Sequence, residues 1–434
     1  MALQFAAFCF IDAMHTQKLQ SFFLFLFILL NAGYSGAEEF SLASSCYSSE
    51  ELQQVRRWEQ RWAGKRIDGR NIDLVADLLP ESFVEIYKNP ATWGAPDEGF
   101  YFYIAPYVPI KETPGMYAAT RTHAPHIALE PDGSISNYEE VAGRPFPNPR
   151  SGLEIAWNFE FNTHGDSCFY QRTGYNIVPA RTVEKVGDQD AWELFWVHRV
   201  DVDPLPFFSD NPKRLARSTF YHMHSPPEFK NTRMFNLRYI EPDKSDDAYM
   251  WFSAFRRIQR ISTKQRTDSI DGTDLIYDDE YGWDGQILRN TYTWKGTKEL
   301  LCARHTDIEK AARTQGQAML NNIRRERFKT YVVDVYNKDP HYIYAKRVWY
   351  IDPETYLILW TEIFDDLGRF WKCFENLTDD VPHGAHQTKN FIVGSHYVDF
   401  QRVHAGTWRN NRVKTGVGIS RDMFTIYNLQ KGGY

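Results

Sequence analysis

The feature of this sequence that most constrains its fold is a long succession of short segments in which apolar and polar residues alternate, separated by turn residues. The first occupies residues 100–104, and further strands are expected at 155–161, 182–186, 191–202, 234–240, 248–253, 286–294, 329–336, 342–351, 356–364 and 369–376. Strands that follow one another without long helices between them predict an antiparallel meander. One helix is expected within the series, at 308–327, because this stretch is rich in Ala, Gln, Glu and Arg.

Aromatic residues make up 16% of the chain, which favours a sheet because aromatic side chains pack well on a pleated surface. If such a sheet curves without closing, its concave face can line an apolar cavity. Two further helices are expected ahead of the strands. Ser48 and Glu51 form a capping-box pattern, and a second helix at about 71–79 should break at Pro80.

The N-terminus has the pattern of a secretory signal peptide at residues 1–37. Lys18 precedes the apolar run 21–30, and the small residues Ser35 and Ala37 precede a cleavage site before Glu38. No later run reaches the roughly 18 apolar residues of a membrane helix. We therefore expect a protein of the periplasm, with outer-membrane association left open.

Four cysteines follow the predicted cleavage site: Cys46, Cys168, Cys302 and Cys373. Their even number and the oxidising compartment predict one or two disulfides, and the sequence does not choose among the three pairings. Free buried thiols are the alternative.

The segment 246–284 brings apolar, basic and acidic blocks close together, which indicates ion pairing at a sheet edge. A calcium loop fits poorly, because aligning Gly272 with the loop glycine puts Thr267 at the first ligand position and Asp278 at the last. We predict instead a structural ionic network of Arg256, Arg257, Arg260, Asp268, Asp274 and Asp278.

No nucleophile-elbow, metalloprotease, Walker or dinucleotide motif occurs in the sequence. His222 and His224 would share one face of a strand, but no third metal ligand is evident. We therefore predict no catalytic residues, no metal and no cofactor. The 56 acidic residues exceed the 50 basic ones, and the two signs are interspersed, so nucleic acid is not an expected partner.

Three blocks carry a resemblance to a bacterial domain-of-unknown-function family of exported proteins related to the lipoprotein-sorting proteins LolA and LolB. The first is the Pro-Phe-Pro connector at 145–147 with Gly-Leu-Glu at 152–154 and Trp-Asn at 157–158. The second is the basic strand 256–260 with Gly-Thr-Asp at 272–274 and Tyr-Asp-Asp at 277–279. The third joins 344–352 to Gly-Arg-Phe-Trp-Lys at 368–372.

The resemblance implies a mainly β fold with some helix, in which a large antiparallel sheet curves into an incomplete half-barrel covered by helices. Residues 141–434 would form this LolA/LolB-like domain, and residues 38–140 an N-terminal extension of helices and extended chain. The implied function is that of a carrier of lipid or another hydrophobic ligand. The alternative is a structural subunit that docks on an envelope transporter or an outer-membrane channel. Six aromatic residues are predicted to line the cavity: Trp157, Phe159, Trp196, Trp251, Tyr277 and Trp349.

Overall fold

The computed structural model describes residues 46–161, 164–242, 244–261, 266–270, 272–313 and 316–432. The predicted signal peptide lies outside these ranges. None of the helices within them is long and apolar enough to cross a membrane.

The N-terminal helices form where the sequence predicts them. Helix α2 (Ser49–Trp62) begins with the capping box: the Glu51 amide donates to Ser48 Oγ at 3.2 Å and the Ser48 amide donates to the Glu51 carboxylate at 2.8 Å. The second predicted helix is a 3-10 helix, η1 (Ile72–Leu78), and the chain resumes as α3 (Glu81–Lys88) after Pro80. Proline before a helix loses no hydrogen bond, because the first amides of a helix have no partner in it.

The remaining helices are short. They are α4 (Pro114–His123), α5 (Gly152–Glu160), α6 (Ile426–Lys431) and the 3-10 helices η2 (Ala124–His126), η3 (Tyr138–Glu140), η4 (Pro227–Phe229), η5 (Tyr277–Gly282), η6 (Ile287–Arg289), η7 (Ile308–Lys310) and η8 (Arg421–Phe424).

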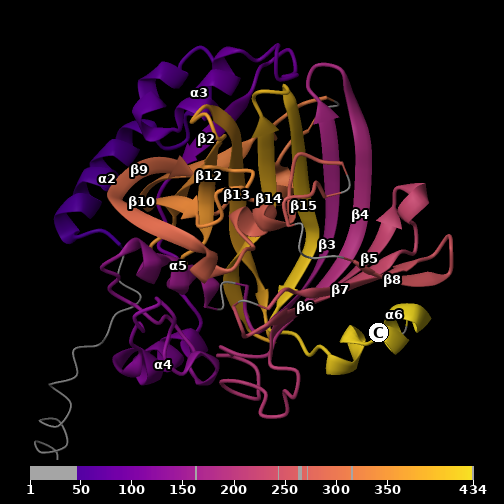
Figure 1. Cartoon of the computed structure of the whole chain (residues 1–434). Coiled ribbons are helices and arrows are strands. Elements are labelled where there is room, and N and C mark those ends of the chain that lie inside the picture. Colours follow the sequence, from indigo (N-terminus) through magenta and orange to yellow (C-terminus); the bar gives the residue numbers. More distant parts are fainter. Residues whose placement is uncertain are drawn as a thin grey trace, which may run out of the picture. The chain divides into compact units, whose positions relative to one another are not determined.

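Within the described residues, fifteen strands form one sheet that does not close (Figure 1). They are β1 (Arg66–Asp68), β2 (Tyr101–Ala105), β3 (Ser167–Val178), β4 (Thr182–Phe195), β5 (Leu215–Ser225), β6 (Arg233–Tyr239), β7 (Asp247–Phe252), β8 (Arg257–Ile261), β9 (Asn290–Cys302), β10 (Ile323–Asn337), β11 (Lys346–Ile351), β12 (Ile358–Phe364), β13 (Phe370–His383), β14 (Gln387–Asp399) and β15 (His404–Thr415). The predicted class, mainly β with helices and a large open sheet, is confirmed.

The sheet consists of two antiparallel meanders joined side by side. Strands β3 to β8 form one and strands β9 to β15 the other, and β15 pairs with β3 along the seam. The first residues of β10 pair in parallel with β2, so part of the segment 38–140 belongs to the same sheet. The sheet is therefore mixed, whereas the sequence predicts a purely antiparallel one.

Helices and the C-terminal segment cover parts of the sheet. Side chains of α2 and α3, including Val55 and Phe83, pack in one core cluster with Phe102, Phe328 and Trp360 of the strands. Figure 1 shows these helices beside β2, β9 and β12. The C-terminal η8 and α6 pack through Met423, Phe424 and Leu429 against one face of β4, β5 and β6. The other face of these three strands is left to form the pocket described below.

Residues 155–161, predicted as a strand, lie in helix α5 and its C-terminal cap. The periodicity misleads because the helix is buried nearly all round, and a short apolar run of that kind does not distinguish helix from strand. A helix start signal was present: Ser151 Oγ accepts from the Glu154 amide at 3.2 Å.

The helix predicted at 308–327 is wrong except for the single turn η7, and its last residues begin strand β10. Long-range pairing overrides helix propensity here. The guanidinium of Arg325 is buried against the carboxylate of Glu375 on β13, a contact that a helix ending at residue 327 would not make.

The predicted disulfides are also absent. Cys46, Cys168, Cys302 and Cys373 are all free in the structure, as in the alternative interpretation. Burial raises the pKa of the Cys302 and Cys373 thiols above the ordinary range, so these side chains act as small apolar groups.

Candidate functional site

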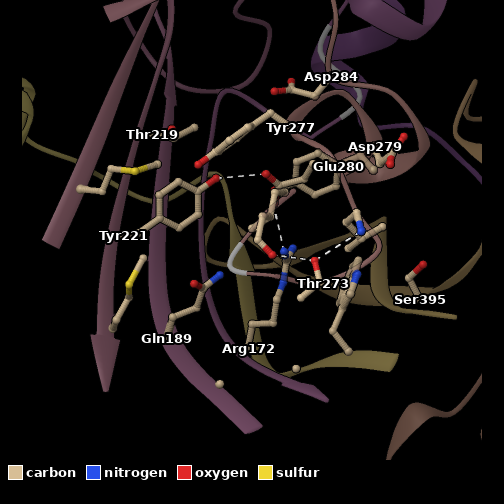
Figure 2. Close-up of a pocket in the computed structure, with 18 of the residues that line it drawn as sticks. Arg172, Gln189, Thr219, Tyr221, Thr273, Tyr277, Asp279, Glu280, Asp284 and Ser395 are labelled. Atoms are coloured by element: carbon tan, nitrogen blue, oxygen red, sulfur yellow. Dashed lines mark hydrogen bonds and ion pairs between the residues drawn. The ribbon is translucent and has the colours of Figure 1, made fainter. Parts of the chain in front are cut away.

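A pocket of about 230 Å³ lies over one face of strands β3 to β7, beneath the segment 266–284 (Figure 2). Strands β13 to β15 complete its wall with Phe374, Tyr397 and Trp408. Both meanders therefore contribute to one cavity. Two other hollows, of about 390 and 470 Å³, are more open to solvent.

The lining side chains form rows across the sheet, because alternate residues of a strand point to the same face. In the central row, Tyr221 of β5 is the register partner of Met234 on β6, which in turn is the partner of Met250 on β7. One neighbouring row contains Gln189 and Met223, and the row on the opposite side contains Glu193, Thr219 and Asn236. The pocket is thus apolar and flexible at its centre.

Beyond this last row the pocket has a charged end, in which arginine and aspartate side chains pair with one another. Asp284 accepts from Arg238 at 3.1 Å, lies 3.3 Å from Arg266 and also pairs with Arg217. Arg238 and Arg266 each approach Asp246 at 3.1 Å. Burial alone would raise the pKa of Asp284, but the three guanidinium groups hold it below its ordinary value.

Arg172 lies in the same row as Gln189 and Met223, since its register partner is Gln189 and that of Gln189 is Met223. Its guanidinium stacks on Trp408 at 3.9 Å and on Tyr170 at 4.6 Å, and pairs with Glu280 at 2.9 Å. Figure 2 shows Glu280 between Arg172 and Tyr221, whose hydroxyl donates to Glu280 at 3.3 Å. One guanidinium nitrogen, Nη2 of Arg172, is buried without a hydrogen-bond partner.

The segment over the pocket is held by buried polar contacts. Asp279 pairs with Arg347 at 2.7 Å and accepts from the Tyr344 hydroxyl at 3.1 Å. Asn376 donates to the carbonyl of Tyr281 at 3.0 Å. Next to it, Gly282 has φ +90°, and a Cβ there would lie 2.9 Å from Ile358. The chain needs glycine at this position for both its conformation and its close approach to β12.

Of the six aromatic residues predicted to line a cavity, the structure places Tyr277 in the pocket wall. Trp157 and Trp349 are buried in the core around α5. Phe159 lies in the same core and borders a small void of about 20 Å³. Trp196 and Trp251 belong to the cluster on the opposite face of the β4–β7 sheet. The pocket is formed instead by Met250, one residue before Trp251, by Met234 on the predicted strand 234–240, and by Tyr221 on a strand that the sequence did not reveal.

Three members of the predicted ionic network form ion pairs, but each pairs with a residue outside the predicted set. Asp278 pairs with Arg266, Arg260 pairs with Asp247, and Asp274 pairs with His404. Arg256, Arg257 and Asp268 are exposed. No ion pair among the described residues involves these three. The other carboxylates of the acidic segment pair with arginines from several strands. Glu280 pairs with Arg172 of β3, Asp279 with Arg347 of β11, and Asp284 with Arg217 of β5 and Arg238 of β6.

Sequence reasoning missed Arg172, Arg217 and Tyr221 because strands β3 and β5 were not predicted. It also missed Glu193, although this residue lies in the predicted strand 191–202, because the sequence does not show which face of that strand meets the pocket. The available signal was the alternation in 215–225, where Arg217, Thr219, Tyr221 and Met223 share one face. Only the register shows that this face meets Met234 and Met250.

The chemistry of the site is that of binding groups. Within the described ranges, no cluster of three or more His, Cys, Asp or Glu side chains is arranged to hold a metal ion. Cys168 and His164 both contact Glu193 behind the pocket, at 3.5 and 3.1 Å. Burial raises the pKa of the Cys168 thiol well above its ordinary value, opposite to the shift that activates a nucleophile.

Comparison with known proteins gives one curated relative, an uncharacterized protein of Pseudomonas aeruginosa. It is 23% identical over 364 residues, which cover 76% of this chain and 74% of the relative. Among solved structures, a DUF1329 family protein from Desulfovibrio piger has 13% identity and a TM-score of 0.47, covering 64% of this chain and 97% of that one. A putative outer membrane lipoprotein-sorting protein domain from Vibrio parahaemolyticus has 14% identity and a TM-score of 0.45, covering 64% and 98%.

The model of one family, described as "Protein of unknown function (DUF1329)", matches residues 66–430. This range includes every strand of the sheet and the whole lining of the pocket. The chain belongs to the DUF1329 family.

Proposed function

We propose that this protein binds a hydrophobic or amphipathic ligand, such as a lipid, in the pocket over β3 to β7 and carries it in the cell envelope without altering it. The observation that carries this proposal is the central row of Tyr221, Met234 and Met250 inside a cavity open at one side. Methionine is unbranched and polarizable, so a wall of this kind adapts to alkyl chains of different shape.

The size of the pocket limits what it can enclose. Its volume of about 230 Å³ is below the roughly 300–1,000 Å³ of pockets that bury a drug-sized molecule. A single alkyl chain or a small apolar molecule fits this description better than a lipid with several chains. Each methylene buried would contribute about 0.8 kcal/mol to binding.

The direct test is to purify the protein from its own cell envelope and examine it by native mass spectrometry, followed by solvent extraction. The expected result is a bound mass that extraction recovers as a lipid or other apolar compound. A protein that is empty, and that also takes up no alkyl probe, would contradict the proposal. Recovery of a dedicated membrane partner on crosslinking, with an empty pocket, would favour docking on an envelope transporter instead.

A pair of variants locates the binding site. Met250→Trp places a bulky ring in the methionine row and should lower affinity for an alkyl probe at least tenfold. Tyr249→Trp is the matched control, since Tyr249 is the adjacent residue and packs on the opposite face with Phe235 at 5.2 Å between ring centroids. Fluorescence titration with an alkyl probe would measure both. Equal affinities of the two variants would place the ligand elsewhere.

A further inference from the structure

Each arginine of the pocket lining is paired with a carboxylate, so none offers an unpaired positive charge to an anionic ligand. Arg217, Arg238 and Arg266 share Asp284, and Arg217 also lies 3.2 Å from Glu193. Arg172, the arginine beside the methionine rows, is neutralised by Glu280. Asp279 is neutralised by Arg347 from outside the pocket, and Asp246 by Arg238 and Arg266. Asp188, the other carboxylate of the lining, accepts from the hydroxyl groups of Thr173 and Ser225. A carboxylate or phosphate brought into this pocket would lose its hydration without gaining an unpaired cation.

Hydrogen-bonding capacity, in contrast, remains free at the same place. Nη2 of Arg172 is buried and lacks a partner, although the side chain is only 10% exposed and is fixed between Trp408 and Tyr170. Its cross-strand neighbour Gln189 faces the same pocket, and its side-chain amide has no hydrogen-bond partner among the described residues. Figure 2 shows both side chains rising from the floor of the pocket toward Glu280 and Thr273.

A buried donor without an acceptor costs about 1–3 kcal/mol, so such a group in a pocket indicates the polar part of a ligand. The guanidinium nitrogen can only donate, whereas the amide of Gln189 can both donate and accept. A hydroxyl group satisfies both side chains. It accepts a hydrogen bond from the Arg172 guanidinium, and it can either donate to or accept from the Gln189 amide. An alkyl chain extending from that hydroxyl would pass over Met223 and Met234.

We propose that the ligand is a single-chain amphiphile with an uncharged, hydroxyl-bearing head, and that Arg172 and Gln189 bind this head. This inference rests on the proposed function and specifies its ligand class. The charge pairing within the pocket selects against fatty-acid and phosphate heads of the same chain length. Glu280 is responsible for this selection, because it neutralises the positive charge of Arg172 through Nη1 and leaves Nη2 able to donate a hydrogen bond.

The experiment compares three probes with the same eight-carbon chain, each below its micelle concentration: 1-octanoylglycerol, octanoate and octyltrimethylammonium. Calorimetric titration of the wild-type protein should give an affinity for 1-octanoylglycerol at least tenfold higher than for either charged probe. Equal or tighter binding of octanoate or of octyltrimethylammonium would overturn the inference while leaving the proposed function intact. Failure of all three to bind would overturn both.

Two variants test the assigned residues. Glu280→Gln keeps the shape of the side chain and releases the charge of Arg172, so affinity for octanoate should rise about tenfold while that for 1-octanoylglycerol changes less than threefold. Gln189→Met should lower affinity for 1-octanoylglycerol about fivefold. Thr219→Val is its control, a polar-to-apolar change elsewhere in the lining, and should alter that affinity less than twofold. An unchanged octanoate affinity in Glu280→Gln would contradict the role of charge pairing. Equal effects of Gln189→Met and Thr219→Val would contradict the role of Gln189.

Discussion

Asp274, a member of the predicted ionic network, contacts residues that lie about 100 or more positions away in the chain. Its carboxylate pairs with His404 Nδ1, and its carbonyl accepts from Lys372 Nζ at 2.5 Å. These contacts tie the segment over the pocket to β13 and β15. His404 also approaches Glu184 of β4 at 2.9 Å, so one imidazole joins three parts of the fold.

We predict that Asp274→Ala destabilises the protein by about 1–3 kcal/mol, since it removes the carboxylate that pairs with the partly buried His404 imidazole, whereas the backbone carbonyl that binds Lys372 is kept. Asp268→Ala is the control, because Asp268 is exposed in the same segment and should change stability by less than about 0.5 kcal/mol. Urea unfolding would measure both. Equal midpoints for the two variants would show that Asp274 is not a structural residue.

The same pair predicts a pH dependence of stability. The hydrogen bond that the His404 imidazole donates to Asp274, against the opposing effect of partial burial, raises the pKa of His404 above its ordinary value. A raised pKa in the folded state gives stability that is fully present below the unfolded pKa of about 6.5 and is lost as pH rises through the folded value. The loss of melting temperature in Asp274→Ala should therefore be larger at pH 5.5 than at pH 9. A loss that does not change with pH would exclude this charge interaction.

At the scale of elements, the segment 266–284 depends on a glycine at the point where it meets β12. Gly282→Ala should destabilise the protein by about 2–4 kcal/mol, through both the positive φ and the contact with Ile358. It should also weaken binding of the alkyl probe, because the segment covers the pocket.

Gly272→Ala separates the effect of the positive φ from that of the close contact. Gly272 has φ +76°, but a Cβ there would meet nothing within 4 Å, so only the conformational cost of about 1 kcal/mol is expected.

Thermal unfolding together with fluorescence titration would distinguish these variants. If Gly282→Ala were no more destabilising than Gly272→Ala, the close packing of the segment on β12 would not be important. A stable Gly282→Ala protein with normal affinity would show that the segment is not part of the binding site.

Elements whose signals are local could be predicted from the sequence. The capping box of α2 and the break at Pro80 both depend on residues within five positions of one another. Helix α5 was predicted as a strand although its start signal at Ser151 is local, because its run of buried apolar residues fits either state. The region 308–327 could not be predicted, because its state depends on partners distant in the chain. In strand β10, for example, the buried guanidinium of Arg325 pairs with Glu375, which lies 50 residues away in the chain.

For the whole molecule, the pocket crosses the seam between the two meanders, where β15 pairs with β3. A bound ligand should therefore stabilise both meanders together. At a ligand concentration 100 times the dissociation constant, the expected stabilisation is about 2.7 kcal/mol. Amide hydrogen exchange should show slower exchange in β3 and β15 alike on addition of 1-octanoylglycerol. Protection confined to one meander would indicate a site that does not span the seam.

The sequence by itself determined that this chain forms a large, mostly antiparallel open sheet preceded by helices, since alternation, turn residues and caps act over a few residues. It did not determine which faces of β4 to β7 enclose a pocket or which arginines neutralise Asp278 and Asp284. A strand has two faces, and a shift of one residue in register exchanges them. Only the tertiary structure sets the registers that align Tyr221, Met234 and Met250 in one row and leave Arg172 beside Gln189.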